Sequence, residues 1–486
     1  MIKKFLLAAV IAAMLLPGEA LAWKAKGTVK GDGKPLAGVI VTDGYRFTLT
    51  GEDGSFSFEA SSRARFIQVV TPSGYVGDFS SGAPQFYISA EPGDDDEYNF
   101  ELLGFGAGRK DYSIFSVSDP QMSSKKHFQK FSGAPLKDLV HMADSIGSLR
   151  PTVGIALGDI AWNRHWVYED YKQAIARTGI PFYAVIGNHD FIQNRSGVEA
   201  GEAYEEEFGP YNYAFFLGDD LVIGLNNIIF KASGLDNPEK SSNRYDEGYS
   251  RETLGFVRGL LKMVPEDTHI YIAQHSPIGF TLEYKQKIIK GAPRLLRLLK
   301  GHKVDFLSGH THIMNVLQLS SDVTDHNAAA VGGAWWATDI CRDGSPRGYE
   351  IITSAPDGDI SWAWHNIDLP DSYAVEFIGP GESARYPDAV LANVWYVNPS
   401  WSAEYFEDGV PAGPMELVYD ISPAYRAEIL EVYDGDYGKI PGYKKPCYTK
   451  HYFKAVPSPG TRELKVLVKA PDGRSWTHCF SIEEKQ

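Results

Sequence analysis

The chain has 486 residues, 43% hydrophobic and 22% charged, which is a globular composition long enough for about three domains. Its formal net charge of −15 argues against a nucleic-acid-binding protein, because phosphate contacts require clustered lysine and arginine. A phosphate-bearing ligand would have to be attracted by a local positive feature, such as a metal centre.

The first residues have the pattern of a secretory signal peptide. Two lysines precede an apolar run over residues 5–16, and the small-residue site Ala20-Leu21-Ala22 follows. This predicts a signal peptide over residues 1–22. The alternative, a retained membrane anchor, is disfavoured because a spanning helix needs roughly 20 apolar residues. We therefore expect an exported protein, periplasmic or secreted, with no membrane span after cleavage.

Residues 23–105 contain short strand-like runs separated by turn pairs such as Asp32-Gly33 and Asp53-Gly54, which predicts a small antiparallel β-sandwich. The segments GTVKGDGKPLAGVIVTDG and TGEDGSFSF resemble the transthyretin-like, Ig-like modules that adjoin carboxypeptidases and many exported bacterial proteins. That resemblance implies the fold and no catalytic role.

From about residue 110, apolar strands alternate with amphipathic helices, which is typical of α/β architecture. We therefore expect an α/β catalytic domain over residues 110–340. After about residue 330 the helical patterns stop and strand-like runs return, for instance Leu464–Val468. Residues 341–486 are accordingly expected to form a β-rich C-terminal domain.

Three cysteines are scattered through the last third of the chain: Cys341, Cys447 and Cys479. An exported compartment permits a disulfide between Cys447 and Cys479, but the spacing does not decide whether they pair. Cysteines so far apart do not form a zinc site.

Five of the expected strands end in loops that carry metal-ligand side chains. Ligands bind beyond the carboxyl ends of strands in open α/β sheets, so these loops should converge on one edge. A carboxylate can bridge two cations, amides offer neutral oxygens, and imidazoles suit Zn, Fe and Mn. Any one match is common as a turn, but five in order predict a dinuclear metal site. Its candidate residues are Asp119, Gln121, Asp159, Asn188, His189, His275, His310 and His312.

Glycines directly precede three of these candidates, at Gly158, Gly187 and Gly309, and are expected to let the backbone turn tightly beside the ions. Histidines outside the motifs, such as His269, are expected to be packed or surface residues.

The ordered motifs DPQ, GD, GNHD, H and GHTH resemble those of the calcineurin-like metallophosphoesterases over roughly residues 112–315. This resemblance implies a four-layer αββα sandwich and two divalent ions, Mn, Fe, Mg or Zn, as cofactors. It also implies ligand roles. The first ion would be bound by Asp119, Gln121 and His312, the second by Asn188, His275 and His310, with Asp159 as the bridge and His189 as the catalytic histidine.

The three-part layout, with GGAWW and DGSPRGY after the catalytic motifs, resembles an exported bacterial subgroup with N-terminal transthyretin-like and C-terminal β domains. One position departs from the family pattern. Gln121 stands where most relatives have histidine, and its amide oxygen is a harder and weaker donor than imidazole. The first site should therefore prefer Mn, Mg or Fe(II) over Zn.

The resemblance implies hydrolysis of a phosphomonoester or phosphodiester by metal-hydroxide attack, with His189 assisting the leaving group. No G-x-S-x-G or G-x-x-x-x-G-K motif suggests another chemistry. The alternative is an exported glycan-binding or scaffold protein with a vestigial metal site. The expected substrate is a small-molecule, glycan or lipid phosphate ester.

The residues that bind substrate are not identified by the motifs. Aromatic residues near the site rim either form a stacking face for substrate or join the domains as core residues, and both readings remain open. They are Trp162, His165, Trp166, Trp335 and Trp336. Candidates for a second phosphate contact are Arg164, Arg342 and Arg347.

Overall fold

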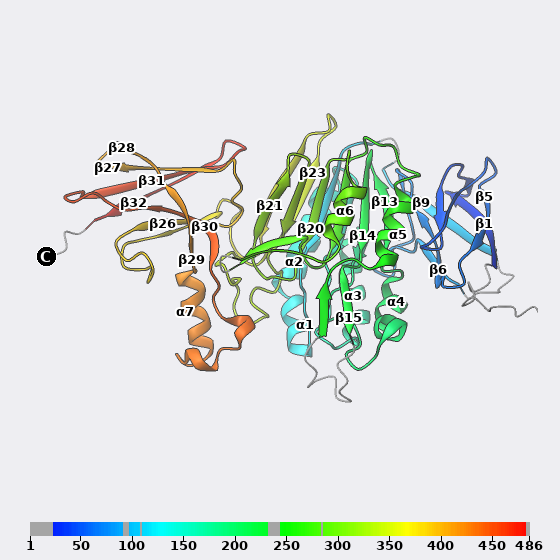
Figure 1. Ribbon diagram of the computed structural model, residues 1–486, viewed down its shortest axis with the longest axis horizontal. Helices are drawn as coiled ribbons and strands as arrows, with labels where there is room; N and C mark the ends of the chain where they lie inside the picture. Colours follow the sequence, from blue (N-terminus) through cyan, green and yellow to red (C-terminus); the bar gives the residue numbers. More distant parts are fainter. Residues whose placement is uncertain (1–22, 91–96, 107–108, 232–243, 283–284, 483–486) are drawn as a thin grey trace, which may run out of the picture.

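The computed structural model describes residues 23–90, 97–106, 109–231, 244–282 and 285–482. The signal peptide expected over residues 1–22 lies outside the described residues. Three modules follow one another, with the N-terminal and C-terminal modules at opposite ends of a central α/β domain (Figure 1). Within the described ranges, no helix is long and apolar enough to cross a membrane.

The N-terminal module is a sandwich of two sheets, as expected. One sheet has the order β2 (Lys34–Pro35), β1 (Trp23–Gly31), β9 (Glu97–Gly104), β7 (Tyr75–Val76), with β5 (Ser55–Ala60) also on β1. The other has the order β4 (Phe47–Leu49), β3 (Ile40–Thr42), β6 (Phe66–Val70), β8 (Tyr87–Ser89). Their pairing is antiparallel except between β1 and β9, which run parallel.

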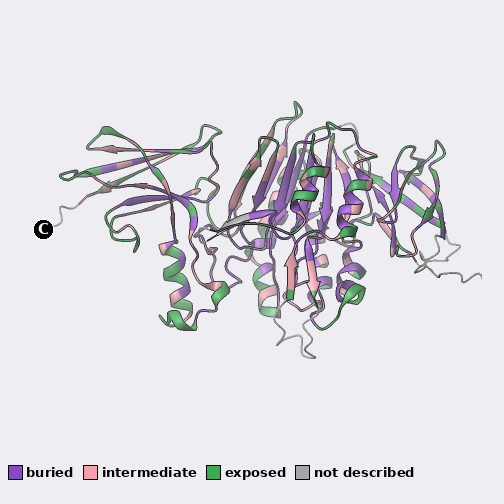
Figure 2. Ribbon diagram, viewed as in Figure 1, coloured by how far each residue is buried: buried purple, intermediate pink, exposed green. Residues whose placement is uncertain are grey.

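Two sheets form the middle of the central domain. The first has the order β12 (Phe182–Ala184), β11 (Thr152–Ala156), β10 (Tyr112–Val117), β23 (Gly348–Ser354), β24 (Ile360–Asn366). The second has the order β13 (Tyr213–Leu217), β14 (Asp220–Leu225), β17 (Ile270–Gln274), β20 (Val304–Ser308), β22 (Val323–Asn327), β21 (Asn315–Ser320). Buried side chains from both sheets, including Ile155 and Tyr271, share one core, and most of the central strands are buried (Figure 2).

Helices cover the outer faces of these sheets and make the four-layer αββα arrangement that the resemblance implied. Helices α1 (Lys125–Phe131), α2 (Ala134–Gly147), α3 (Val167–Ile175) and α4 (Glu202–Phe208) contribute to the core outside the first sheet. Helices α5 (Arg251–Leu260) and α6 (Ala292–Leu298) contribute to the core outside the second. The Ser250 hydroxyl accepts the Thr253 N–H and starts α5, which buries Leu254, Val257 and Leu260. Strand β15 (Ile228–Lys231) pairs antiparallel with β16 (Arg244–Glu247), and β18 (Gly279–Leu282) pairs antiparallel with β19 (Lys285–Ile288).

The central sheet continues past residue 340, where the sequence placed the domain boundary. Strand β23 pairs antiparallel with β10, and β24 pairs with β23, so both complete the first sheet. They follow one another without intervening helices, and for this reason the sequence pattern assigned them to the β-rich region. The hydrogen-bonded sheet extends to Asn366.

The C-terminal module contains two four-stranded sheets. Their orders are β25 (Val375–Ile378), β26 (Val390–Val394), β30 (Thr449–Ala455), β29 (Glu416–Asp420), and β28 (Val410–Pro414), β27 (Ser402–Glu407), β31 (Glu463–Lys469), β32 (Ser475–Ser481). The expectation that helices stop after residue 330 was wrong, because α7 (Pro423–Val432) follows β29. Only Tyr425 and Ile429 of this helix are buried, so its apolar pattern is faint. All three cysteines are free.

Candidate metal centre

The predicted ligands lie in loops that follow β10, β11, β12, β17 and β20. Strands β10, β11 and β12 are parallel to one another in the first sheet, and β17 and β20 are parallel in the second. Their carboxyl ends therefore bring the loops of both sheets to one edge. The contacts below join all eight candidate residues into one cluster.

Five of the candidate ligands have left-handed backbone conformations. Such conformations in residues other than glycine cost about 1–3 kcal/mol each and are concentrated at functional sites. The φ angles are 51° at Asp119, 39° at Gln121, 51° at Asp159, 73° at His310 and 52° at His312. Because surrounding structure must offset this cost, the loops are built to aim these side chains rather than to minimise local energy.

The three glycines serve two different purposes. Gly158 has a φ of 82°, which is the tight turn expected from the sequence. Gly187 and Gly309 are needed for close approach instead. A Cβ atom at Gly187 would overlap the Asp159 carboxylate, and one at Gly309 would overlap the Ser118 hydroxyl.

Asp159 lies between the two predicted groups of ligands. Its Oδ1 accepts the His189 backbone N–H at 2.8 Å. Its Oδ2 lies 2.7 Å from the Gln121 side-chain amide and 3.4 Å from His275 Nε2. One oxygen therefore contacts both groups of ligands. Burial opposes ionisation of this carboxyl, but the nearby His275 and His189 outweigh it and hold the pKa of Asp159 well below its usual range.

Asp119 belongs to the first group of ligands. One carboxylate oxygen accepts the Ser118 hydroxyl and the His310 backbone N–H, the latter at 2.7 Å. The other lies 3.4 Å from His312 Nε2. Burial again opposes ionisation, and His312 outweighs it, so that the pKa of Asp119 is lowered.

Each cluster histidine has one nitrogen held from outside and the other directed inward. His275 Nδ1 lies 2.8 Å from the Leu157 carbonyl oxygen, and its Nε2 lies 3.1 Å from Asn188 Oδ1. His312 Nδ1 lies 3.3 Å from the Gly333 carbonyl oxygen. Its Nε2 is buried and makes no hydrogen bond within the described part of the chain. Metal-binding histidines are typically oriented in this way.

His310 is held from outside through Nε2, whereas His275 and His312 are held through Nδ1. Its Nε2 lies 3.4 Å from the Glu247 carboxylate and 3.3 Å from the Tyr245 hydroxyl, both on β16. Its Nδ1 lies 3.0 Å from His275 Nε2. Ligand atoms of Asp159, His275 and His310 all lie within 4.8 Å of one another, close enough for a single cation to contact all three with small adjustments.

Gln121 also fits a metal site. Its amide lies 2.7 Å from Asp159 Oδ2 and 3.3 Å from Asp119 Oδ1, while its Oε1 is buried without a hydrogen bond to described residues. Rotation of the amide exchanges its two ends, so that a cation between the carboxylates would be met by oxygen. The residues present therefore fit two divalent ions.

His189 contacts this cluster through its backbone N–H, which donates to Asp159 Oδ1. The imidazole stacks on Trp162, with centroids 4.5 Å apart, and its Nδ1 lies 3.0 Å from Asn163 Oδ1. Burial lowers the pKa of His189 to about 4, against the attraction of Asp159. The ring therefore lies beside the predicted metal ligands.

Three residues that support the site were not predicted as such. Asp190, the last residue of GNHD, accepts the N–H groups of Ala161 and Gly187 and so ties two ligand loops together. Asn163 orients His189, and Glu247 orients His310. The only sequence signal for Asp190 was its place in the GNHD motif. Glu247 belongs to no motif, so only the fold reveals its contact with His310.

The aromatic residues predicted near the site rim differ in their contacts. Trp162 and Trp335 lie against site histidines, whereas Trp336 is buried and donates from Nε1 to the Pro120 carbonyl oxygen at 2.8 Å. His165 packs against Tyr168, and Trp166 is exposed.

Two of the three arginines predicted as candidates for a second phosphate contact bind other groups of the protein. Arg347 forms ion pairs with Asp339 and Asp368, which occupy its guanidinium. Arg342 donates from Nε to the Lys445 carbonyl oxygen at 3.1 Å. Arg164 is partly buried.

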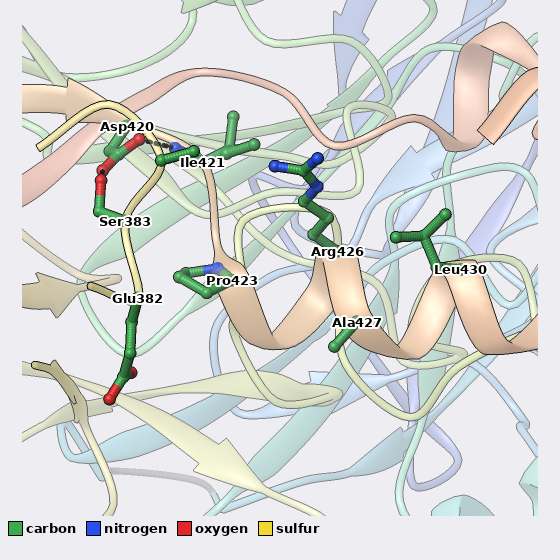
Figure 3. A pocket seen from close by; sticks show the side chains of 9 residues that line it. Glu382, Ser383, Asp420, Ile421, Pro423, Arg426, Ala427 and Leu430 are labelled. Carbon is green, nitrogen blue, oxygen red and sulfur yellow. Dashed lines mark hydrogen bonds between the residues drawn. The ribbon is translucent and has the colours of Figure 1, made fainter. Parts of the chain in front are cut away.

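A separate cavity of about 230 Å³ lies in the C-terminal module, beside the start of α7 (Figure 3). Arg426 and Asp420 are among its lining residues, and Asp420 already accepts hydrogen bonds from the Ser383 hydroxyl and the Ile421 N–H. None of the predicted site residues lines it.

Several protein families and known proteins are similar to this chain. Three family models match: the N terminal of calcineurin-like phosphoesterase over residues 23–104, calcineurin-like phosphoesterase over 113–314, and the C terminal of calcineurin-like phosphoesterase over 325–476. A probable glycerophosphodiester phosphodiesterase of Arcobacter nitrofigilis is 25% identical over 206 residues, 41% of this chain and 71% of the relative.

Solved structures with related folds include a dimetal phosphatase from Danio rerio, 11% identical, with a TM-score of 0.36 over 53% of this chain and 97% of that one. Another is the purple acid phosphatase PPD1 of yellow lupin (Lupinus luteus), 10% identical, with a TM-score of 0.38 over 68% of this chain and 67% of that one.

The four-layer sandwich and the cluster of carboxylate, amide and imidazole ligands define a metallophosphoesterase fold. The chain belongs to the calcineurin-like phosphoesterase family. Its catalytic domain is flanked by the family's N-terminal and C-terminal domains.

Proposed function

We propose that this protein is an exported, metal-dependent phosphoesterase that hydrolyses a small-molecule, glycan or lipid phosphate ester. The observation that carries the proposal is the position of Asp159, whose Oδ2 contacts both Gln121 and His275. Two divalent ions held here would supply an activated water and neutralise charge on the phosphoryl oxygens. The relative named as a glycerophosphodiester phosphodiesterase supports a diester substrate.

The chain's own residues would hold the ions and assist the leaving group. Asp119, Asp159 and the cluster histidines hold the centre, while His189 lies beside it and contacts the departing ester oxygen. Asn163, 3.0 Å from His189 Nδ1, fixes the direction of that ring, and Trp162 fixes its plane. From this position the ring would assist departure by stabilising the charge that develops on an alkoxide leaving oxygen.

The proposal is tested with p-nitrophenyl phosphate and bis(p-nitrophenyl) phosphate, each assayed with Mn, Mg, Zn, Fe or no added metal after chelation. We expect turnover only with metal. The relative rates on the two substrates separate a monoesterase from a diesterase. No turnover with any metal, together with no bound metal in elemental analysis, would contradict the proposal and favour an exported binding protein instead.

A further inference from the structure

A continuous wall of aromatic rings flanks the metal centre and ends in the C-terminal module. Trp162 stacks on His189, with ring centroids 4.5 Å apart, and Trp335 stacks on His312 at 3.9 Å. The ring of Tyr443 lies 5.7 Å from Trp162 and 5.1 Å from Trp335. The rings thus connect both sides of the centre to a residue far away in the sequence.

The segment that carries Tyr443 is fixed against the catalytic domain. Tyr425 of α7 donates its hydroxyl to the Lys444 carbonyl oxygen at 2.7 Å. Tyr425 also shares a buried cluster with Ala334 of the loop that carries Trp335. Tyr443 itself is 48% exposed, so part of its ring is open to a ligand. Residues of both the catalytic domain and the C-terminal module therefore form the wall.

Basic side chains lie close to this wall. Lys444 Nζ lies 5.9 Å from the centroid of the Tyr443 ring. Lys130 Nζ donates to the Trp336 carbonyl oxygen at 2.5 Å, one residue from Trp335. Burial and the charges of Lys130, Lys444 and Lys126 lower the pKa of His127 on α1, which agrees with a basic cluster at this place. In a chain of net charge −15, such a cluster favours an anion.

We propose that the ring wall of Trp162, Trp335 and Tyr443 selects substrates whose esterified group carries a flat ring and, beyond it, a second anionic group. The ring stacks on the wall, and the anion meets Lys130 and Lys444. This inference rests on the proposed phosphoesterase activity, since it places the scissile phosphate at the metal centre. In the competing arrangement the rings only join the two domains and do not affect selectivity.

Three methyl diesters separate these possibilities, because they differ only in the second ester group: ethyl methyl, phenyl methyl and 4-carboxyphenyl methyl phosphate, assayed by product release. The wild-type protein should have kcat/KM values that rise in that order. Tyr443→Ala should lower the preference for phenyl over ethyl about three- to tenfold, mainly through KM. Tyr443→Phe keeps the ring and should keep the preference. Lys444→Gln should lower only the preference for carboxyphenyl over phenyl.

Tyr437→Ala is the matched control, because Tyr437 is a similarly exposed tyrosine of the same module, at 44%, without a contact to the wall. It should leave all three kcat/KM values unchanged. Equal wild-type rates on the three esters would contradict the proposal that the ring wall selects substrates. An unaltered preference in a folded Tyr443→Ala variant would contradict it as well. If Tyr443→Ala does not fold, Tyr443→Leu, which keeps apolar bulk without a π face, takes its place. Failure of wild-type protein on every ester with every metal would instead overturn the phosphoesterase proposal itself.

Discussion

His312 and Trp335 stack nearly face to face, with ring centroids 3.9 Å apart and ring planes 14° apart. Both residues have left-handed backbone conformations, so two separate loops are bent to bring the rings together. The indole thereby limits rotation of a predicted metal ligand whose Nδ1 is held by the Gly333 carbonyl oxygen.

We predict that Trp335→Ala weakens metal binding at the first site about tenfold, because supporting residues around a ligand typically contribute 10- to 100-fold in affinity. The measurement is a titration of metal-free protein with Mn. Trp335→Phe retains a flat ring and should recover most of the affinity. Equal affinity in all three proteins would show that the stack does not support His312.

His189→Ala should leave metal content near that of wild type, because the ring of His189 stacks on Trp162 and is held by Asn163, and the family resemblance gives it no ligand role. We expect kcat to fall by about 10²–10⁴, the usual size of a general-acid contribution. Elemental analysis beside steady-state kinetics checks both parts. If metal disappears together with activity, His189 is a ligand and its assigned role is mistaken.

Gln121→His should raise the ratio of activity with Zn to activity with Mn. The amide lies between Asp119 and Asp159, and imidazole is a softer and stronger donor at the same place. An unchanged ratio in an active variant would mean that Gln121 does not touch metal and that another group completes the first site.

Stability should depend on pH through His365, which lies between Asp138 of α2 and Asp371. Burial favours the neutral ring, but both carboxylates outweigh it and raise the pKa of His365 from 6.5 to about 9. The folded pKa exceeds the unfolded one, so this stabilisation is full below about pH 6.5 and is lost as pH rises through about 9.

Chemical denaturation of wild type and His365→Gln at pH 6 and pH 9.5 measures this effect. The variant should be less stable by about 1–3 kcal/mol at pH 6 and much closer to wild type at pH 9.5. A difference that is the same at both pH values would contradict the assignment of the charge to His365.

The clustering of the candidate ligands could be predicted from the sequence because each one is encoded locally. Each ligand directly follows an apolar strand, and parallel strands bring such loops together whatever lies between them. Asp159 and His275 are 116 positions apart, yet both motifs are short and complete in themselves.

The parts that the sequence did not reveal depend on contacts without a local pattern. Strand β23 joins the first sheet by pairing with β10, more than 230 residues earlier in the chain, and β24 joins it by pairing with β23. Tyr443 reaches the site because α7 packs on the loop of Ala334, and a helix with two buried residues has little periodicity to detect. Glu247 approaches His310 from β16, a four-residue strand.

Asp159 is the residue on which the account depends most. Asp159→Asn should lose metal and turnover together, because an amide cannot balance the charge of two cations. Asp322→Asn, a change of the same kind at an exposed loop position, should retain both. Full activity in Asp159→Asn would remove this residue from the bridging position.

The most direct measurement is the metal content and phosphodiesterase activity of the wild-type protein before chelation, after chelation and after addition of Mn. We predict about two metal ions per chain, loss of bis(p-nitrophenyl) phosphate hydrolysis on chelation, and recovery in proportion to the metal restored. Hydrolysis that persists at the full rate in metal-free protein would contradict the account.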